Sequence, residues 1–183
     1  MQRVQTPAKD AAVLVAPLLL SLALLRSSPA LAEGVSEWHE FPEWPPRLAL
    51  DHVLVQTGLY TTHFSSDPDH TNDQGLISVS LYTPDRWFAG GARFKNSFGQ
   101  DSHYLYAGRT FPIWQERDLS LQAKFSAGLL HGYRGEYRDK IPFNHLGVAP
   151  AALPTLAARW GRAETELIVF GTAGMMITAG WRF

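Results

Sequence analysis

The chain has no cysteine, almost no net charge and only one long apolar run, and each absence narrows the possibilities. Without cysteine there is no disulfide framework, which fits an exported protein that does not use one. A net charge of −1 gives no reason to expect a nucleic-acid partner. After Leu25 no segment approaches the roughly 20 apolar residues of a membrane helix. A mature chain embedded in a membrane could therefore only be a closed barrel.

Familiar catalytic and metal-binding motifs are also missing. The histidines do not combine with carboxylates at metal-ligand spacing, and no Gly-Lys-Ser/Thr loop or Gly-x-Ser-x-Gly elbow occurs. We therefore find no support for a conventional soluble hydrolase, and we expect no metal or other cofactor. The histidines considered are His63, His70, His103, His131 and His145.

The N-terminus has the pattern of a secretory signal. Arg3 and Lys9 precede an apolar stretch over 11–25, and the small-residue sequence Ala30-Leu31-Ala32 follows. We predict a signal peptide over 1–32 with cleavage after Ala32. An uncleaved anchor is the alternative, but the apolar run is short and the Ala-x-Ala ending argues against it.

Residues 33–50 are expected to form an N-terminal amphipathic arm outside the main fold. They mix aromatic and acidic side chains before the break at Pro45-Pro46. The arm could lie at a membrane interface or simply pack on the rest of the protein. Its aromatic residues are Trp38, Phe41 and Trp44.

From residue 51 onward the hydrophobic pattern alternates with a period of two. In 118–129 every odd position is apolar, and every even position is polar, charged or glycine. Shorter segments over 77–82, 92–97 and 177–183 repeat the alternation. A soluble sandwich would turn the apolar face to its core, whereas a barrel in a membrane turns it to lipid.

The candidate strands number eight, as in the smallest transmembrane barrels. Long polar connections at 65–72 and 131–140 alternate with short turns at 83–85 and 161–163, as external loops and periplasmic turns do. We predict an all-β fold over 51–183, an eight-stranded antiparallel transmembrane β-barrel. The candidate strands are 51–65, 75–83, 86–97, 102–113, 118–131, 142–160 (interrupted), 163–170 and 173–183.

The sixth segment carries Pro142, Pro150 and Pro154, which lack the N–H that a strand ladder needs. Such residues normally argue against a central strand. A barrel with a local gap in its wall would accommodate them, and a lipid chain could slip in sideways there.

A polar group gathers where strands meet loops. His63 ends the first strand, Asn96 and Ser97 end the third, and the up-and-down order points both ends outward from the cell. His63 could take a proton from a hydroxyl while Ser97 or Asn96 stabilises the oxyanion, or Ser97 could itself be the nucleophile. The plain alternative is that barrel rims are routinely polar.

These residues resemble the lipid A palmitoyltransferase (PagP) family of eight-stranded outer-membrane enzymes. Phe94-Lys95-Asn96-Ser97-Phe98 is similar to that family's Phe-Lys-Asp-Ser-Trp, and Gly108 falls at its interior glycine. Pro150-Ala-Ala-Leu-Pro154 is similar to the Pro-x-x-x-Pro of its laterally open strand. The final Trp181-Arg182-Phe183 is like its aromatic last strand. The resemblance covers most of 51–183.

The resemblance implies a catalytic group of His63, Asn96 and Ser97, with Asn96 where the family has Asp. A carboxylate role would then be lost or pass to Asp101 or Asp67. Because the first loop is short, Thr61 is an alternative match for the catalytic position, and His70 is an alternative histidine. The acyl pocket would be lined by Tyr104, Tyr106 and Gly108. Gly108 would measure the length of the acyl chain, and the chain would enter beside Pro150 and Pro154. For Gly108, a strand bulge or close backbone approach is the alternative.

The first hypothesis is thus a monomeric acyltransferase of the bacterial outer membrane. It would take a palmitoyl chain from a glycerophospholipid donor, place it on lipid A as acceptor, and contact outer-membrane lipid. The second is a non-catalytic small barrel for adhesion, envelope stability or passage of an apolar molecule. A lipid A deacylase ranks last, because its His-x-Ser spacing is not present in the last strands.

Overall fold

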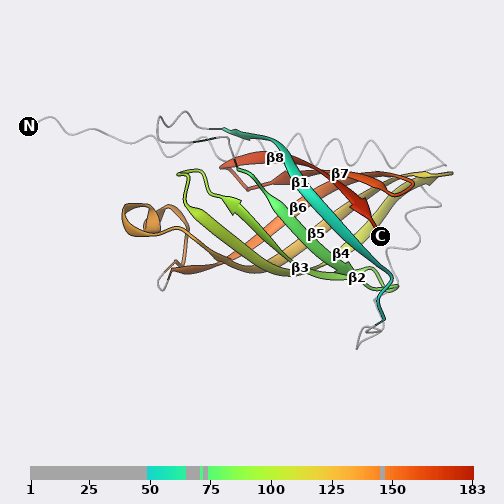
Figure 1. The fold of residues 1–183 in the computed structure, drawn as a ribbon, viewed down its shortest axis with the longest axis horizontal. Coiled ribbons are helices and arrows are strands. Elements are labelled where there is room, and N and C mark those ends of the chain that lie inside the picture. Colours follow the sequence, from blue (N-terminus) through green and yellow to red (C-terminus); the bar gives the residue numbers. More distant parts are fainter. Residues whose placement is uncertain (1–48, 65–70, 72–73, 145–146) are drawn as a thin grey trace, which may run out of the picture. The chain divides into compact units, whose positions relative to one another are not determined.

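The computed structural model describes residues 49–64, 71, 74–144 and 147–183, which form a closed antiparallel barrel (Figure 1). Each strand pairs with the next along the chain, and the last returns to pair with the first. The prediction of an all-β, eight-stranded barrel is confirmed. The strands are β1 (His52–His63), β2 (Ile77–Tyr82), β3 (Trp87–Lys95), β4 (Asp101–Glu116), β5 (Leu119–His131), β6 (Val148–Trp160), β7 (Ala163–Val169) and β8 (Gly174–Arg182).

Two strands differ most in length from the sequence prediction. β4 continues to Glu116 despite Pro112, because its pairing with β5 shifts between Pro112 and Trp114, and such irregularities tolerate proline. β6 starts at Val148 and not at residue 142. The segment Gly135–Lys140 before it is a short 3₁₀ helix.

The outer wall of the barrel is apolar. In β5 the odd positions, such as Phe125 and Leu129, are exposed, while Ser120, Lys124 and Ser126 are buried inside. The same holds in β2 and β8, where Ile77, Val79, Leu81, Ile177 and Trp181 are exposed. The apolar face of the alternation therefore points out of the barrel and not into a core.

The third strand inverts this rule near its end. Ala92 and Phe94 line the interior, whereas Arg93 and Lys95 point outward with exposed side chains. The expectation that the alternation over 92–97 would repeat the apolar-out pattern is therefore wrong for these residues. Charged groups here occupy the outer wall.

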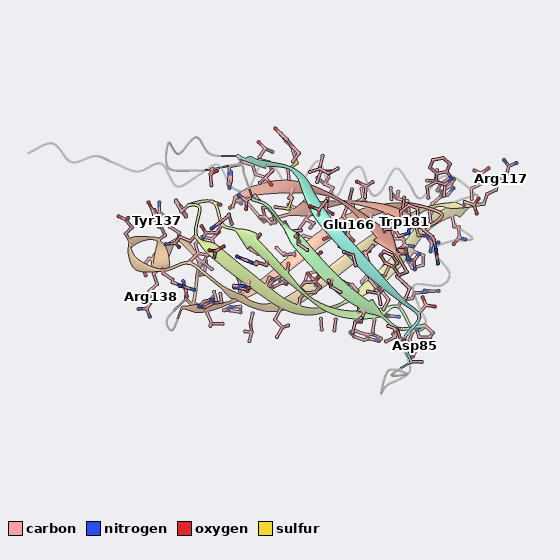
Figure 2. The ribbon with its side chains drawn as sticks, viewed as in Figure 1. Asp85, Arg117, Tyr137, Arg138, Glu166 and Trp181 are labelled. Atoms are coloured by element: carbon pink, nitrogen blue, oxygen red, sulfur yellow. The ribbon has the colours of Figure 1, made fainter. Side chains whose placement is uncertain are left out.

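The two ends of the barrel differ (Figure 2). Short turns, which carry Asp85 and Arg117, lie at one end, and the 3₁₀ helix with Tyr137 and Arg138 lies at the other. We call these the turn end and the loop end. Within the ranges given above, no helix is long and apolar enough to cross a membrane. The predicted signal peptide over 1–32 and nearly all of the arm over 33–50 lie outside the described residues, as does most of the 65–72 connection.

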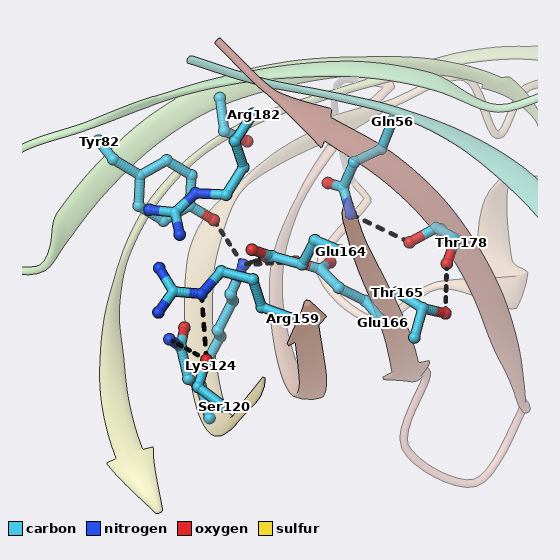
Figure 3. A network of polar contacts seen from close by, with 12 residues as sticks. Gln56, Tyr82, Ser120, Lys124, Arg159, Glu164, Thr165, Glu166, Thr178 and Arg182 are labelled. Carbon is cyan, nitrogen blue, oxygen red and sulfur yellow. Dashed lines mark hydrogen bonds and ion pairs between the residues drawn. The ribbon is translucent and has the colours of Figure 1, made fainter. Parts of the chain in front are cut away.

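Toward the turn end, a buried ionic cluster fills the interior (Figure 3). The ammonium of Lys124 donates to the hydroxyl of Tyr82 at 2.7 Å and to carboxylates of Glu164 and Glu166, the latter at 2.6 Å. These side chains are almost fully buried. Buried charge of this kind is tolerated only when it is paired and hydrogen-bonded, as it is here.

Candidate active site

A β-bulge in β1 decides where His63 points. The pairing of β1 with β8 shifts between Gly58 and Tyr60, so Leu59 and Tyr60 both lie exposed on the outer wall. Beyond the bulge Thr61 is buried, and His63 lines the interior. Unbroken alternation from the buried Leu54 would have placed His63 outside.

His63 and Ser97 meet at the loop end of the interior. Their Nε2 and Oγ atoms are 2.7 Å apart, a hydrogen-bond distance. A base within hydrogen-bond reach of a hydroxyl is the geometry that activates a serine nucleophile. The structure thus brings together two of the three residues proposed from the sequence. Thr61, the alternative match, lies opposite Met176 on β8.

Asn96 lies beside this pair but holds the turn that follows β3. Its Oδ1 accepts the backbone N–H groups of Phe98 and Gln100, each at 3.0 Å. Its Nδ2 donates to Gln100 Oε1 at 3.3 Å and to the Gly132 carbonyl at 3.5 Å. Because both its Oδ1 and its Nδ2 are engaged in holding this turn, the buried Asn96 amide positions Ser97 and is not directed at an oxyanion.

The proposed carboxylate substitutes do not reach the histidine. Asp101 faces the outer wall, where its carboxylate pairs with Lys95 at 3.0 Å and with Arg93 at 3.5 Å. The suggestion that Asp101 takes over a carboxylate role is therefore wrong. Asp67 and His70 lie outside the described residues.

Tyr133, in the connection after β5, is a site residue that the sequence did not single out. Its side chain lines the same interior space beside Ser97. Burial raises the pKa of the Tyr133 phenol, partly opposed by hydrogen bonding to Ser97. The phenol therefore keeps its proton and can donate a hydrogen bond next to the serine. Its place in a loop, without strand periodicity, left no pattern to find it by.

A cavity of about 840 Å³ runs from this pair into the barrel. Its volume is in the range of ligand-binding pockets, and most of its lining is apolar or aromatic. Tyr104 and Tyr106 stack on each other in its wall, with ring centroids 5.0 Å apart. Tyr104 donates to the Ala151 carbonyl at 3.2 Å, and Tyr106 bonds Ser80 at 2.8 Å. The two tyrosines predicted as pocket residues thus do line an interior space.

Gly108 lies inward below these tyrosines, but Phe88 covers it. A Cβ added at Gly108 would approach the Phe88 ring to 2.5 Å and the Phe125 carbonyl oxygen to 2.3 Å. The cavity is lined at this depth by Phe88 and Tyr82, with Lys124 beside them. Gly108 therefore leaves room for the Phe88 ring, which packs against it. Phe88 forms the surface that a ligand would contact.

The wall is incomplete beside the prolines of β6. β6 pairs with β5 along its whole length, but with β7 only from Thr155 onward. Pro150 and Pro154 both lie in the part of β6 that precedes this pairing, where their missing N–H groups cost no bond to β7. Ala152, an exposed residue between them, also lines the cavity. The interior therefore approaches the outer surface at this gap.

Among the described residues, no three His, Asp or Glu side chains cluster as a metal site would require. No protein-family model matches this chain, and no curated protein sequence matches it either.

Proposed function

We propose that the chain is an acyltransferase of the bacterial outer membrane that moves a long acyl chain from a glycerophospholipid to lipid A. The observation that carries this proposal is the hydrogen bond between His63 and Ser97 at the mouth of an apolar cavity. The base and the nucleophile lie at the mouth of a cavity that could hold an acyl chain. This arrangement favours transfer of a fatty acyl group over chemistry on a polar substrate.

The outer wall supports a membrane location. The barrel exposes large apolar side chains on six of its eight strands, far more than a monomeric soluble surface needs. Aromatic residues gather toward the turn end, as in the interfacial girdles of outer-membrane barrels. These are Trp87, Phe111, Trp114, Trp160, Trp181 and Phe183.

The reaction proceeds in two steps, with an acyl-serine between them. Ser97 Oγ attacks the donor's ester carbonyl carbon while His63 Nε2 takes the hydroxyl proton. The bond from the carbonyl carbon to the glycerol oxygen breaks, and that oxygen leaves with the proton from His63 as the lysophospholipid. His63 then takes a proton from a lipid A hydroxyl, whose oxygen attacks the acyl-serine and releases Ser97 with its proton restored.

Tyr133 stabilises the negative oxygen that forms in each step. Its buried phenol stays protonated and lies beside Ser97, so it can donate to the developing oxyanion. This assignment replaces the amide of Asn96, which is engaged in its own turn.

The donor chain reaches the cavity through the gap between β6 and β7. There it lies beside Tyr104 and Tyr106, with its terminal methyl toward Phe88. The ionic cluster of Lys124, Glu164 and Glu166 fills the interior beyond, which argues against the alternative of a barrel that passes apolar molecules through.

Mass spectrometry of lipid A from cells with and without the protein tests the proposal. We expect one additional acyl chain on lipid A, and its loss in the Ser97→Ala variant by a factor of about 10² or more. The control is Ser120→Ala, which removes a buried serine near the turn end. An unchanged acylation pattern in cells that contain the folded protein would overturn the proposal. Transfer at full rate by Ser97→Ala would overturn the role of the serine.

A further inference from the structure

The outer wall near the loop end carries a patch that acyl transfer does not explain. It spans three neighbouring strands and the start of the loop after β5, and none of its members is among the residues that line the cavity. We call it the cationic patch, and it consists of Arg93, Lys95, His103, His131 and Arg134.

Strand register brings the patch together. Arg93 pairs with His103 across β3 and β4, and His103 pairs with His131 across β4 and β5. The two imidazole rings have centroids 6.3 Å apart, and a guanidinium nitrogen of Arg134 lies 3.5 Å from His131 Nε2. Basic groups from distant parts of the chain therefore form one continuous surface.

The patch keeps an excess of positive charge. Among the described residues of this part of the wall, the acidic one is Asp101, and it pairs with both Lys95 and Arg93. Within the described part of the chain, Arg93, Lys95 and Arg134 are three cationic side chains of the patch beside this one carboxylate. Like charges held this close on a protein surface repel one another, and a bound anion would relieve that repulsion.

The apolar wall begins directly below the patch. Leu105 follows His103 by two positions on the outer face of β4, and it is 69% exposed. Leu129 precedes His131 in the same way on β5 and is 56% exposed. Charged groups at the edge of an apolar band, here the edge nearer the loop end, lie at the level of lipid headgroups.

A comparison with Arg109 shows that not every outward cation needs a ligand. Arg109 lies on the outer face of β4 near the turn end, where its guanidinium carbon is 5.8 Å from the Trp87 ring centroid and 5.4 Å from that of Phe111. Aromatic faces thus stabilise this cation at the turn end. At the loop end, Arg93 and Lys95 instead share the single carboxylate of Asp101.

We propose that the cationic patch binds the phosphate groups of a lipid A molecule packed against the outside of the barrel. Guanidinium groups bind phosphate oxygens through paired, charge-assisted hydrogen bonds, and the adjacent leucines would contact the acyl chains. Arg93 and Arg134 hold the phosphate, with Lys95 and the two imidazoles around it. The inference rests on the membrane location but not on acyl transfer.

Binding of purified, detergent-refolded full-length barrel to lipid A tests this site. The probes are diphosphoryl lipid A, the same lipid with its phosphates removed, and phosphatidylglycerol, with bound lipid counted by native mass spectrometry. The test variant is Arg93→Gln/Arg134→Gln. The matched control is Arg86→Gln/Arg117→Gln, which removes two positive charges from the turn end.

We expect the test variant to bind diphosphoryl lipid A about tenfold or more weakly, and the control to bind it as the wild type does. Binding of the dephosphorylated lipid should not differ between variants. Equal binding by both variants, or equal loss in both, would overturn the proposal. Displacement of lipid A by equimolar phosphatidylglycerol would overturn the choice of lipid A. The binding assay includes no acyl donor and needs no acyl transfer, so failure of acyl transfer leaves this test intact.

Discussion

Asn96 stabilises the turn that presents Ser97, and the bonds it makes need an amide. A carboxylate at this position could still accept the N–H groups of Phe98 and Gln100, but it would face the Gly132 carbonyl without a donor. We therefore expect Asn96→Asp to lower stability by about 1–3 kcal/mol without raising the transfer rate. Asn96→Ala, which also loses both acceptor bonds, should lower stability further. Urea unfolding and transfer assays measure the two effects, and a faster Asn96→Asp enzyme would show that a carboxylate acts on His63.

Phe88 should set the length of the acyl chain. Its ring lies over Gly108 at the depth where the cavity ends, so Phe88→Leu would open space for further methylene groups. We expect the variant to transfer longer chains than the wild type, as read by the mass of the modified lipid A. Phe125→Leu, on the outer face of β5, is the control. An unchanged chain length in folded Phe88→Leu would show that another residue limits the slot.

The buried ionic cluster makes a prediction about stability. Replacing Lys124 by Met leaves the carboxylates of Glu164 and Glu166 buried together without their cation. Removing one partner of such a group typically costs about 3–5 kcal/mol. The triple variant Lys124→Met/Glu164→Gln/Glu166→Gln should recover most of that loss, as measured by thermal unfolding in detergent. A single variant as stable as the wild type would contradict this account.

At the scale of the element, the sequence predicted the strands better than it predicted the irregularities within them. Alternation is visible in β5 because Ser120 and Lys124 face a polar interior while Leu119 and Phe125 face outward. The bulge at Leu59 has no comparable signature, although it turns His63 inward. The sequence nevertheless predicted that His63 and Ser97 lie together. In an up-and-down barrel the ends of the first and third strands lie at the same rim.

Other features of the barrel depend on long-range register. The cluster around Lys124 joins β2, β5 and β7, so no local pattern could predict it. The same holds for the cationic patch, whose residues are separated by loops. Phe88 was missed because its importance comes from what lies opposite it, a glycine on the neighbouring strand.

The gap between β6 and β7 is an element that can be closed by design. Continuing the β6–β7 register by one position places Pro154 opposite Val169, both on the outer face. The chain has no cysteine, so Pro154→Cys/Val169→Cys would introduce a single disulfide across the gap. We expect the oxidised form to transfer acyl chains at least about tenfold more slowly, because ligand binding requires access to the cavity.

The control for that crosslink is Leu156→Cys/Leu167→Cys, at a position where β6 and β7 already pair. Its disulfide should leave the transfer rate unchanged. Reduction should restore the rate of the gap variant. Full activity of the oxidised gap variant would show that the donor chain enters elsewhere.

At the scale of the whole molecule, the barrel combines a closed interior with an apolar exterior. Many of its polar side chains lie inside, in the ionic cluster and in bonds such as the one from Gln56 to Thr178 at 3.1 Å (Figure 3). Its apolar side chains form the outer wall. A protein surrounded by water gains nothing from this arrangement, whereas a protein surrounded by lipid requires it.

Leu105 tests that conclusion, because it is among the most exposed side chains on the wall at 69%. In water, arginine at so exposed a position would change stability by no more than about 0.5 kcal/mol. In a bilayer, Leu105→Arg should cost about 1–2 kcal/mol. This lies between the cost of a cation at the midplane of a barrel wall and the smaller cost near the interface, because Leu105 lies only two positions from His103 of the cationic patch. Reversible urea unfolding from lipid vesicles measures the difference. Glu116→Arg, in the exposed end of β4 beside its turn, is the control and should cost little. Equal stability of Leu105→Arg and wild type in vesicles would mean that this wall does not face lipid, and the membrane location would have to be given up with it.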